Sequence, residues 1–153
     1  MLNKETVLTL FEETSQVLVY NLDFIPEDKL DWKPAPEAKS VLEVVNHLAE
    51  FLDTISRSLG LSDSVFVAAT DRDEAKQVLS QACQRYATAV RDASPATLSK
   101  KFRDDMPFTV GWMVTASTLD TIHHAGQIAY IQTLLGDNEI HFDESALPDW
   151  AVG

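Results

Sequence analysis

The sequence has 153 residues, 45% of them hydrophobic, which is enough to fill one core, so we expect a single domain over residues 1–153. The formal net charge of −12, with the lysines and arginines scattered, opposes binding to nucleic acids and to anionic membranes. Because no apolar run reaches bilayer length, no signal peptide is recognisable and Cys83 is the one cysteine, we expect a cytoplasmic protein whose fold is held by packing.

Helical periodicity predicts four long helices, separated by short breaks rich in proline, glycine, serine and aspartate. The first covers about residues 4–24 and stops before Pro26, since proline cannot continue a helix. Ser40 caps the second helix, which extends to about residue 58. Glu43 stands three residues after this cap, as in a capping box.

The third helix is predicted over about residues 71–91 and the fourth over about residues 110–135. The remaining residues, with His141 among them, are expected to form an irregular tail folded back on the helices. Four amphipathic helices in one small domain predict an all-α protein with the architecture of a four-helix bundle.

Polar residues of the fourth helix lie on its apolar side. At 100° per residue, Asp120, His124 and Gln127 fall within about 60° of one another, in the same stripe as Met113. A buried carboxylate is costly unless it meets a cation, a proton or a dense set of hydrogen bonds. The stripe therefore indicates a site that a divalent metal ion can satisfy.

A third candidate ligand, His47, lies at the margin of the apolar stripe of the second helix, beside Phe51. We expect it to point into a groove between helices. Glu43 and Glu50 stand one turn on either side and could orient its second ring nitrogen, or could be plain surface charges. His123 is about 100° round the helix from its neighbour in the fourth helix, so adjacency does not make it a ligand.

Two segments resemble the DinB/YfiT-like superfamily of four-helix-bundle proteins, which are described as metal-dependent enzymes. The first is Leu-Asp-Trp-Lys-Pro-Ala-Pro at residues 30–36, which continues through Ser40 to Asn-His-Leu-Ala at residues 46–49. The second is His-His-Ala-Gly-Gln at residues 123–127. The resemblance covers nearly the whole chain, and the two segments together are more specific than either alone.

The resemblance implies a site of three histidines on one divalent ion, one from the second helix and two spaced four apart on the last. His47 and His124 match the first and third of these, but Asp120 stands where the second is expected. A set of two histidines and one aspartate can still bind zinc or nickel, which we expect first, or manganese or iron. The resemblance also implies a homodimer.

For activity, the resemblance implies a metal that activates water or a low-molecular-weight thiol, for hydrolysis or S-transfer on a small molecule. A metal lowers the pKa of a thiol, so no nucleophile from the protein would be needed. Glu43 and Glu50 are candidates for a general base. Whether the protein is an enzyme stays open, because a non-catalytic bundle that binds a ligand or takes part in a stress response is the alternative.

Each candidate residue also has a structural interpretation. Asp120 could form only a hydrogen bond with His124 one turn away, leaving a site without metal. For Gln127 we favour a contact between helices over a hydrogen bond to a ligand. The tryptophans are expected to pack, and His141 in the tail has no strong claim, although the tail could close the pocket. The three tryptophans are Trp32, Trp112 and Trp150.

Overall fold

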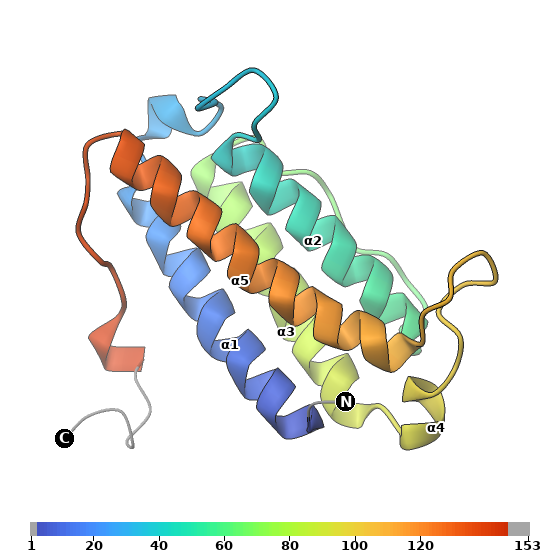
Figure 1. The fold of residues 1–153 in the computed structure, drawn as a ribbon. Coiled ribbons are helices and arrows are strands. Elements are labelled where there is room, and N and C mark those ends of the chain that lie inside the picture. The colour runs from blue at the N-terminus through green and yellow to red at the C-terminus, as the bar shows by residue number, and fades with distance from the viewer. Residues whose placement is uncertain (1–2, 147–153) are drawn as a thin grey trace.

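The structure, a computed structural model, describes residues 3–146. Its four long helices are α1 (Lys4–Asn21), α2 (Val41–Ser58), α3 (Arg72–Asp92) and α5 (Val110–Leu134), and they pack as a bundle (Figure 1). The prediction of an all-α four-helix bundle is confirmed. None of the described helices combines the length and the apolar character needed to cross a membrane.

Short helices join the long ones. They are η1 (Leu22–Phe24), η2 (Glu27–Lys29), α4 (Pro95–Leu98) and η3 (Glu144–Ala146). The expected first helix therefore ends three residues early as an α-helix and tightens into η1. The sequence did not predict α4. In this helix the side chain of Ser94 accepts a hydrogen bond from the backbone N–H of Thr97, and Pro95 is the first residue.

Local capping chemistry explains where α2 and α3 begin. Ser40 Oγ accepts from the backbone N–H of Glu43, and the Glu43 carboxylate accepts from the backbone N–H of Ser40, so the predicted capping box is present. At α3 the side chain of Asp71 accepts from the backbone N–H of Glu74 as a simple N-cap. Both caps satisfy N–H groups that have no partner inside the helix.

The four long helices form a closed ring of neighbours. α1 packs against α3 and α5, and α2 packs against the same two helices. α1 and α2 therefore lie diagonally, as do α3 and α5 (Figure 1). Because α2 and α5 are neighbours, side chains from the second and fourth long helices can meet on one side of the bundle.

The connection from α2 to α3 has about the length that the predicted helix bounds leave, but the sequence did not predict its path. It runs back along α2, so that Val65 donates its backbone N–H to Asp53 and Ala69 lies beside Asn46 (Figure 1). The Asn46 side chain donates to the carbonyl of Ala69 and accepts from its N–H, at 3.0 and 2.8 Å. One amide thus holds this connection against the start of α2.

Outside the site, the expectations for packing had mixed outcomes. Trp32 is half-buried and packs against the core, as predicted. Trp112 was predicted to pack, but 49% of it is exposed, because it lies on the outer side of α5. The described part of the tail folds back on α1, where Asn21 donates to the carbonyl of His141. Trp150 lies outside the described residues.

Replacing Asn46 with alanine removes both hydrogen bonds to Ala69 and leaves these backbone groups dependent on solvent. We expect the free energy of unfolding to fall by roughly 1–3 kcal/mol, measured by urea denaturation. Asn138→Ala is the control, because Asn138 is exposed and makes no hydrogen bond within the described chain. Equal stability of the two variants would contradict the role given to Asn46.

Candidate metal centre

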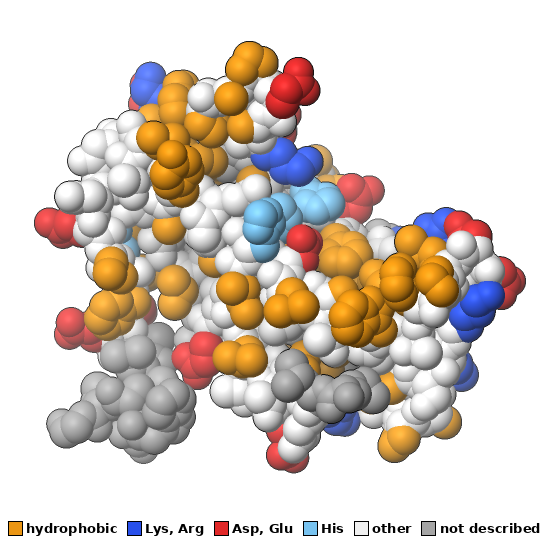
Figure 2. Space-filling model, viewed as in Figure 1, with side chains coloured by type: hydrophobic (Ala, Val, Ile, Leu, Met, Phe, Trp, Pro, Cys, Tyr) orange, Lys and Arg blue, Asp and Glu red, His pale blue; other side chains and the backbone are white. Residues whose placement is uncertain are grey.

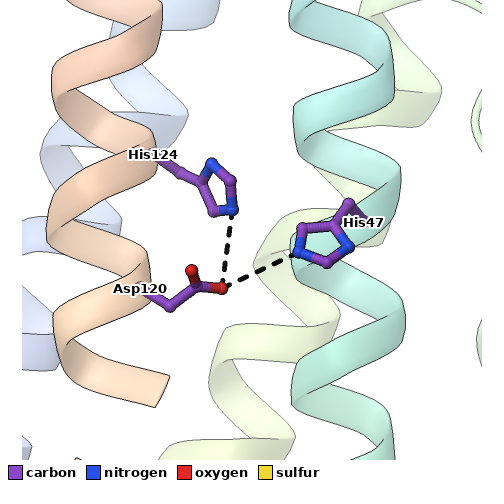
Figure 3. Close-up of side chains that lie close together, drawn as sticks. All are labelled: His47, Asp120 and His124. Atoms are coloured by element: carbon purple, nitrogen blue, oxygen red, sulfur yellow. Dashed lines mark ion pairs between the residues drawn. The ribbon is translucent and has the colours of Figure 1, made fainter. Parts of the chain in front are cut away.

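Three side chains from two helices converge on the seam between α2 and α5 (Figure 3). Asp120 Oδ2 lies 3.5 Å from His124 Nε2, one turn along α5, and 3.9 Å from His47 Nε2 on α2. One ligand atom from each residue lies within 4.8 Å of the other two. The structure thus brings together the three residues that the sequence singled out as metal ligands.

The cluster opens from the interior towards solvent. His124 is 4% exposed, whereas the side chains of Asp120 and His47 are 31% and 45% exposed. In Figure 2 pale blue histidine and red carboxylate surface lie together on the face seen in Figure 1. A small molecule can therefore reach the cluster from outside while His124 stays anchored in the bundle.

Gln127 fixes the orientation and the tautomer of His124. The His124 Nδ1–H donates to Gln127 Oε1 at 2.7 Å, since an amide oxygen can only accept. In the neutral ring, Nε2 then carries a lone pair and no proton. We had expected Gln127 to make a contact between helices, and this prediction is wrong. Gln127 instead bonds His124 within α5, because a spacing of three residues puts both side chains on the same face of the helix.

His124 Nε2 is buried and has no hydrogen-bond partner in the described protein. It faces the carboxylate of Asp120, so two acceptors point at each other. A proton between them would remove the conflict, but burial, together with the nearby His47 and His123, lowers the pKa of His124 despite the bond to Gln127 and the charge of Asp120. The arrangement therefore favours a neutral imidazole whose free lone pair can accept another cation.

The three residues fit a divalent ion. Imidazole nitrogen and carboxylate oxygen bind zinc at about 2.0–2.2 Å, which places neighbouring ligand atoms about 3–3.5 Å apart. The distance of 3.5 Å from the Asp120 carboxylate to His124 Nε2 lies in this range, the 3.9 Å to His47 Nε2 is longer, and the three ligand atoms lie within 4.8 Å of one another. His47 and Asp120 are exposed enough to close this difference by small rotations.

The other face of the His47 ring lies towards Phe51. The two rings are parallel with centroids 6.4 Å apart, and the ring of His124 meets His47 edge-on at 5.2 Å. Within the described structure neither Glu43 nor Glu50 makes a hydrogen bond to His47. Packing against aromatic rings, rather than a carboxylate on the second ring nitrogen, therefore positions this histidine.

The two candidate bases differ in their surroundings. The carboxylate of Glu43 accepts from Lys33 Nζ at 2.7 Å and from the backbone N–H of Ser40. The hydrogen bond from Lys33, and then that from Ser40, lowers the pKa of Glu43. Its role as a helix cap thus makes Glu43 a weaker base, whereas Glu50 is exposed and makes no ion pair within the described chain.

The remaining histidines lie outside the cluster. His123 is exposed, and its ring stands 5.3 Å from that of His124 without contributing to the cluster. His141 is hydrogen-bonded to Asp137 at 2.8 Å and stacks on Phe24 with ring centroids 3.6 Å apart. The described tail therefore packs on α1 and does not cover the cluster.

Two grooves offer room for a small molecule. One, of about 610 Å³, has His47 and Glu50 in its wall, together with Phe66 from the α2–α3 connection. A larger one, of about 960 Å³, lies between α1 and α3. Cys83 lines this larger groove, but burial raises the pKa of its thiol to about 12, so it is a poor nucleophile. Of the three cluster residues His47 lines the smaller groove, so this groove meets the candidate site on the side of His47.

The sequence model of the DinB superfamily matches residues 10–128, a stretch that contains all three members of the cluster. The crystal structure of the DinB-like protein YjoA from Bacillus subtilis has the same fold, with a TM-score of 0.72 and 16% identity, over 90% of this chain and 96% of that one. At this identity the likeness shows the fold alone. A comparison with curated proteins found no match.

The hydrogen bond from His124 to Gln127 stabilises the protonated ring, so removing it should make protonation harder. We expect His124 in the metal-free protein to titrate below the usual pKa of histidine, and lower still in Gln127→Leu, when followed by NMR of the ring signals. The signal of His141, which packs elsewhere, should not respond to the substitution. A pKa of His124 that is unchanged or raised in Gln127→Leu would contradict this account.

Proposed function

Because this chain belongs to the DinB superfamily, we propose that His47, Asp120 and His124 hold a divalent metal ion and that the protein is a metal-dependent enzyme acting on a small molecule. The reaction is hydrolysis or S-transfer from a low-molecular-weight thiol. The protein would work in the cytoplasm, where such thiols are reduced. Zinc and nickel are the first ions to test, and manganese and iron(II) are acceptable to the same ligands.

The observation that carries this proposal is the unpartnered Nε2 of His124. A buried imidazole nitrogen without a partner costs free energy, and here it faces a carboxylate that is also an acceptor. Gln127 holds the ring so that this lone pair points to Asp120. Such support of a ligand histidine by a hydrogen bond on its other nitrogen is typical of metal sites.

The residues around the cluster divide the remaining tasks. A bound divalent ion would lower the pKa of a coordinated water or thiol towards neutral pH. The groove beside His47 would accommodate the small molecule, and Phe66 gives it an apolar contact. Glu50, in the wall of that groove, is the candidate to accept the released proton.

A ligand-binding or stress-related protein without catalysis is the alternative. It is favoured by Asp120, because a carboxylate in place of a third histidine lowers the charge of the site and weakens its power to acidify a bound molecule. Under this alternative the cluster could still bind an ion. Turnover, not metal content, therefore separates the two functions.

Removing either histidine should abolish the site. We expect the wild-type protein to carry about one divalent ion per chain after re-metallation, and His47→Ala and His124→Ala to bind it at least 10- to 100-fold more weakly. Plasma mass spectrometry and titration with a chelating indicator measure both quantities. His141→Ala is the matched control, since His141 also pairs with an aspartate four residues away but lacks a third ligand.

If the wild-type protein holds no ion after incubation with zinc, nickel or manganese, the metal-dependent function is wrong. If it holds an ion but shows no turnover in assays of hydrolysis and thiol transfer, the ligand-binding alternative replaces the enzyme. Loss of both metal and turnover in Asp120→Ala would support the enzyme.

We also propose that the protein forms a homodimer through the outer face of α5. This face exposes five large apolar side chains, and α5 contains no lysine, arginine or glutamate and has Asp120 as its one aspartate. The five are Trp112, Leu119, Ile122, Tyr130 and Leu134. In Figure 2 hydrophobic side chains follow the course of α5 beside the histidines.

The lack of lysine, arginine and glutamate on α5 makes a second copy of the chain a suitable partner for this face. A two-fold interface brings the same surface against itself, so any net charge on that surface repels its own copy. In a chain with a formal charge of −12, an uncharged face is the one where two copies can meet with least repulsion.

Static light scattering at micromolar concentration should give the mass of a dimer. In Leu119→Glu and Tyr130→Glu a carboxylate would be buried without a partner, so we expect the dissociation constant to rise by about a hundredfold or more. Val67→Glu is the control, because Val67 is also an exposed apolar side chain, at 72%, but lies in the α2–α3 connection. A monomer mass for the wild-type protein would refute the dimer.

A further inference from the structure

Asp120 is the central member of the cluster. Its Oδ2 lies nearer to each histidine nitrogen than the 4.8 Å that spans the whole group. The described residues give Asp120 no hydrogen bond and no lysine or arginine partner. Its negative charge is therefore met only by two imidazoles, and a metal ion would be its main counter-charge.

Ligand chemistry distinguishes this set from three histidines. Imidazole suits zinc, copper, nickel and iron, whereas carboxylate oxygen suits manganese and magnesium. Two histidines and one carboxylate with open positions are the ligand set of many iron(II) sites. Replacing one imidazole by a carboxylate thus shifts a site towards harder ions, which depend more on charge and oxygen ligands.

The surroundings leave room for ligands from outside the protein. Both Asp120 and His47 are partly exposed, and all three ligand atoms come from the two helices of one seam. The described protein supplies no fourth cysteine, histidine or carboxylate to the group. An ion there would keep several positions for water or substrate. Manganese and iron(II) commonly bind with such open positions, whereas structural zinc sites are closed by four protein ligands.

From these observations we infer that Asp120 makes the site permissive for manganese, an ion that the same site with histidine at position 120 would hold poorly. The inference rests on the proposed metal function and deepens it by naming the class of ion. It does not reverse the general order of affinity, in which zinc and nickel bind more tightly than manganese. The carboxylate makes the difference in affinity between zinc and manganese smaller.

The test compares the wild-type protein with Asp120→His and with Asp120→Asn, which keeps the shape and removes the charge. Binding of manganese is followed by the loss of the electron paramagnetic resonance signal of the free ion, and binding of zinc by competition with a chelating indicator. We expect Asp120→His to weaken manganese about tenfold and to strengthen zinc about tenfold, and Asp120→Asn to weaken manganese more than zinc. Circular dichroism checks that each variant is folded.

The relaxation rate of water protons adds a second readout. In the wild-type protein, bound manganese should speed this relaxation strongly, because water exchanges at its open positions. His123→Ala is the control for a histidine next to the cluster and should leave both affinities unchanged, since His123 is exposed and outside the group.

The outcomes separate the inference from the proposed function. If the wild-type protein binds zinc but its preference over manganese is the same in Asp120→His, the inference is overturned and the metal function stands. If the wild-type protein binds none of zinc, nickel and manganese, the metal function itself fails, and the inference fails with it.

Discussion

The candidate site depends on the packing of α2 against α5. α5 alone sets Asp120 one turn before His124, which makes a pair and not a cluster. His47 joins them because a buried apolar face holds α2 beside α5, and a polar residue at the margin of that face reaches the seam between the two helices. That face consists of Val41, Val44, Val45, Leu48, Leu52 and Ile55. A change that rotates α2 would move His47 away from Asp120 and His124.

The same seam resolves a conflict between burial and polarity. A bundle interior offers few hydrogen-bond partners, so each ring nitrogen of a buried histidine needs a partner supplied by a nearby side chain or backbone group. His124 uses one nitrogen for Gln127 on its own helix and leaves the other without a partner at the end that opens towards solvent. A structural histidine would be expected to satisfy both nitrogens. The asymmetry is what distinguishes a position suited to an ion from a position suited to packing.

The sequence predicted local features better than the paths between them. The caps of α2 and α3 rest on contacts three residues apart, which a sequence displays directly, and Ser40 with Glu43 formed as expected. The stripe of Asp120 and His124 follows from helical spacing in the same way. The return of the α2–α3 connection along α2 depends on long-range bonds such as Asn46 to Ala69, for which the sequence has no periodic signal. The approach of His47 also needed tertiary packing, and here the family resemblance supplied what spacing could not.

Position 120 connects the fold to the chemistry that the site can support. An aspartate there adds one negative charge beside two neutral imidazoles, so a divalent ion would keep a smaller net charge than with three histidines. A smaller charge acidifies a coordinated molecule less, which works against reactions that need a strongly activated nucleophile. It would not weaken the ability of the ion to hold and orient a substrate, for which the groove beside His47 would offer space. Chemistry that relies on orientation, or on a substrate that already ionises near neutral pH as many thiols nearly do, therefore fits this site better than hydrolysis of an unreactive bond.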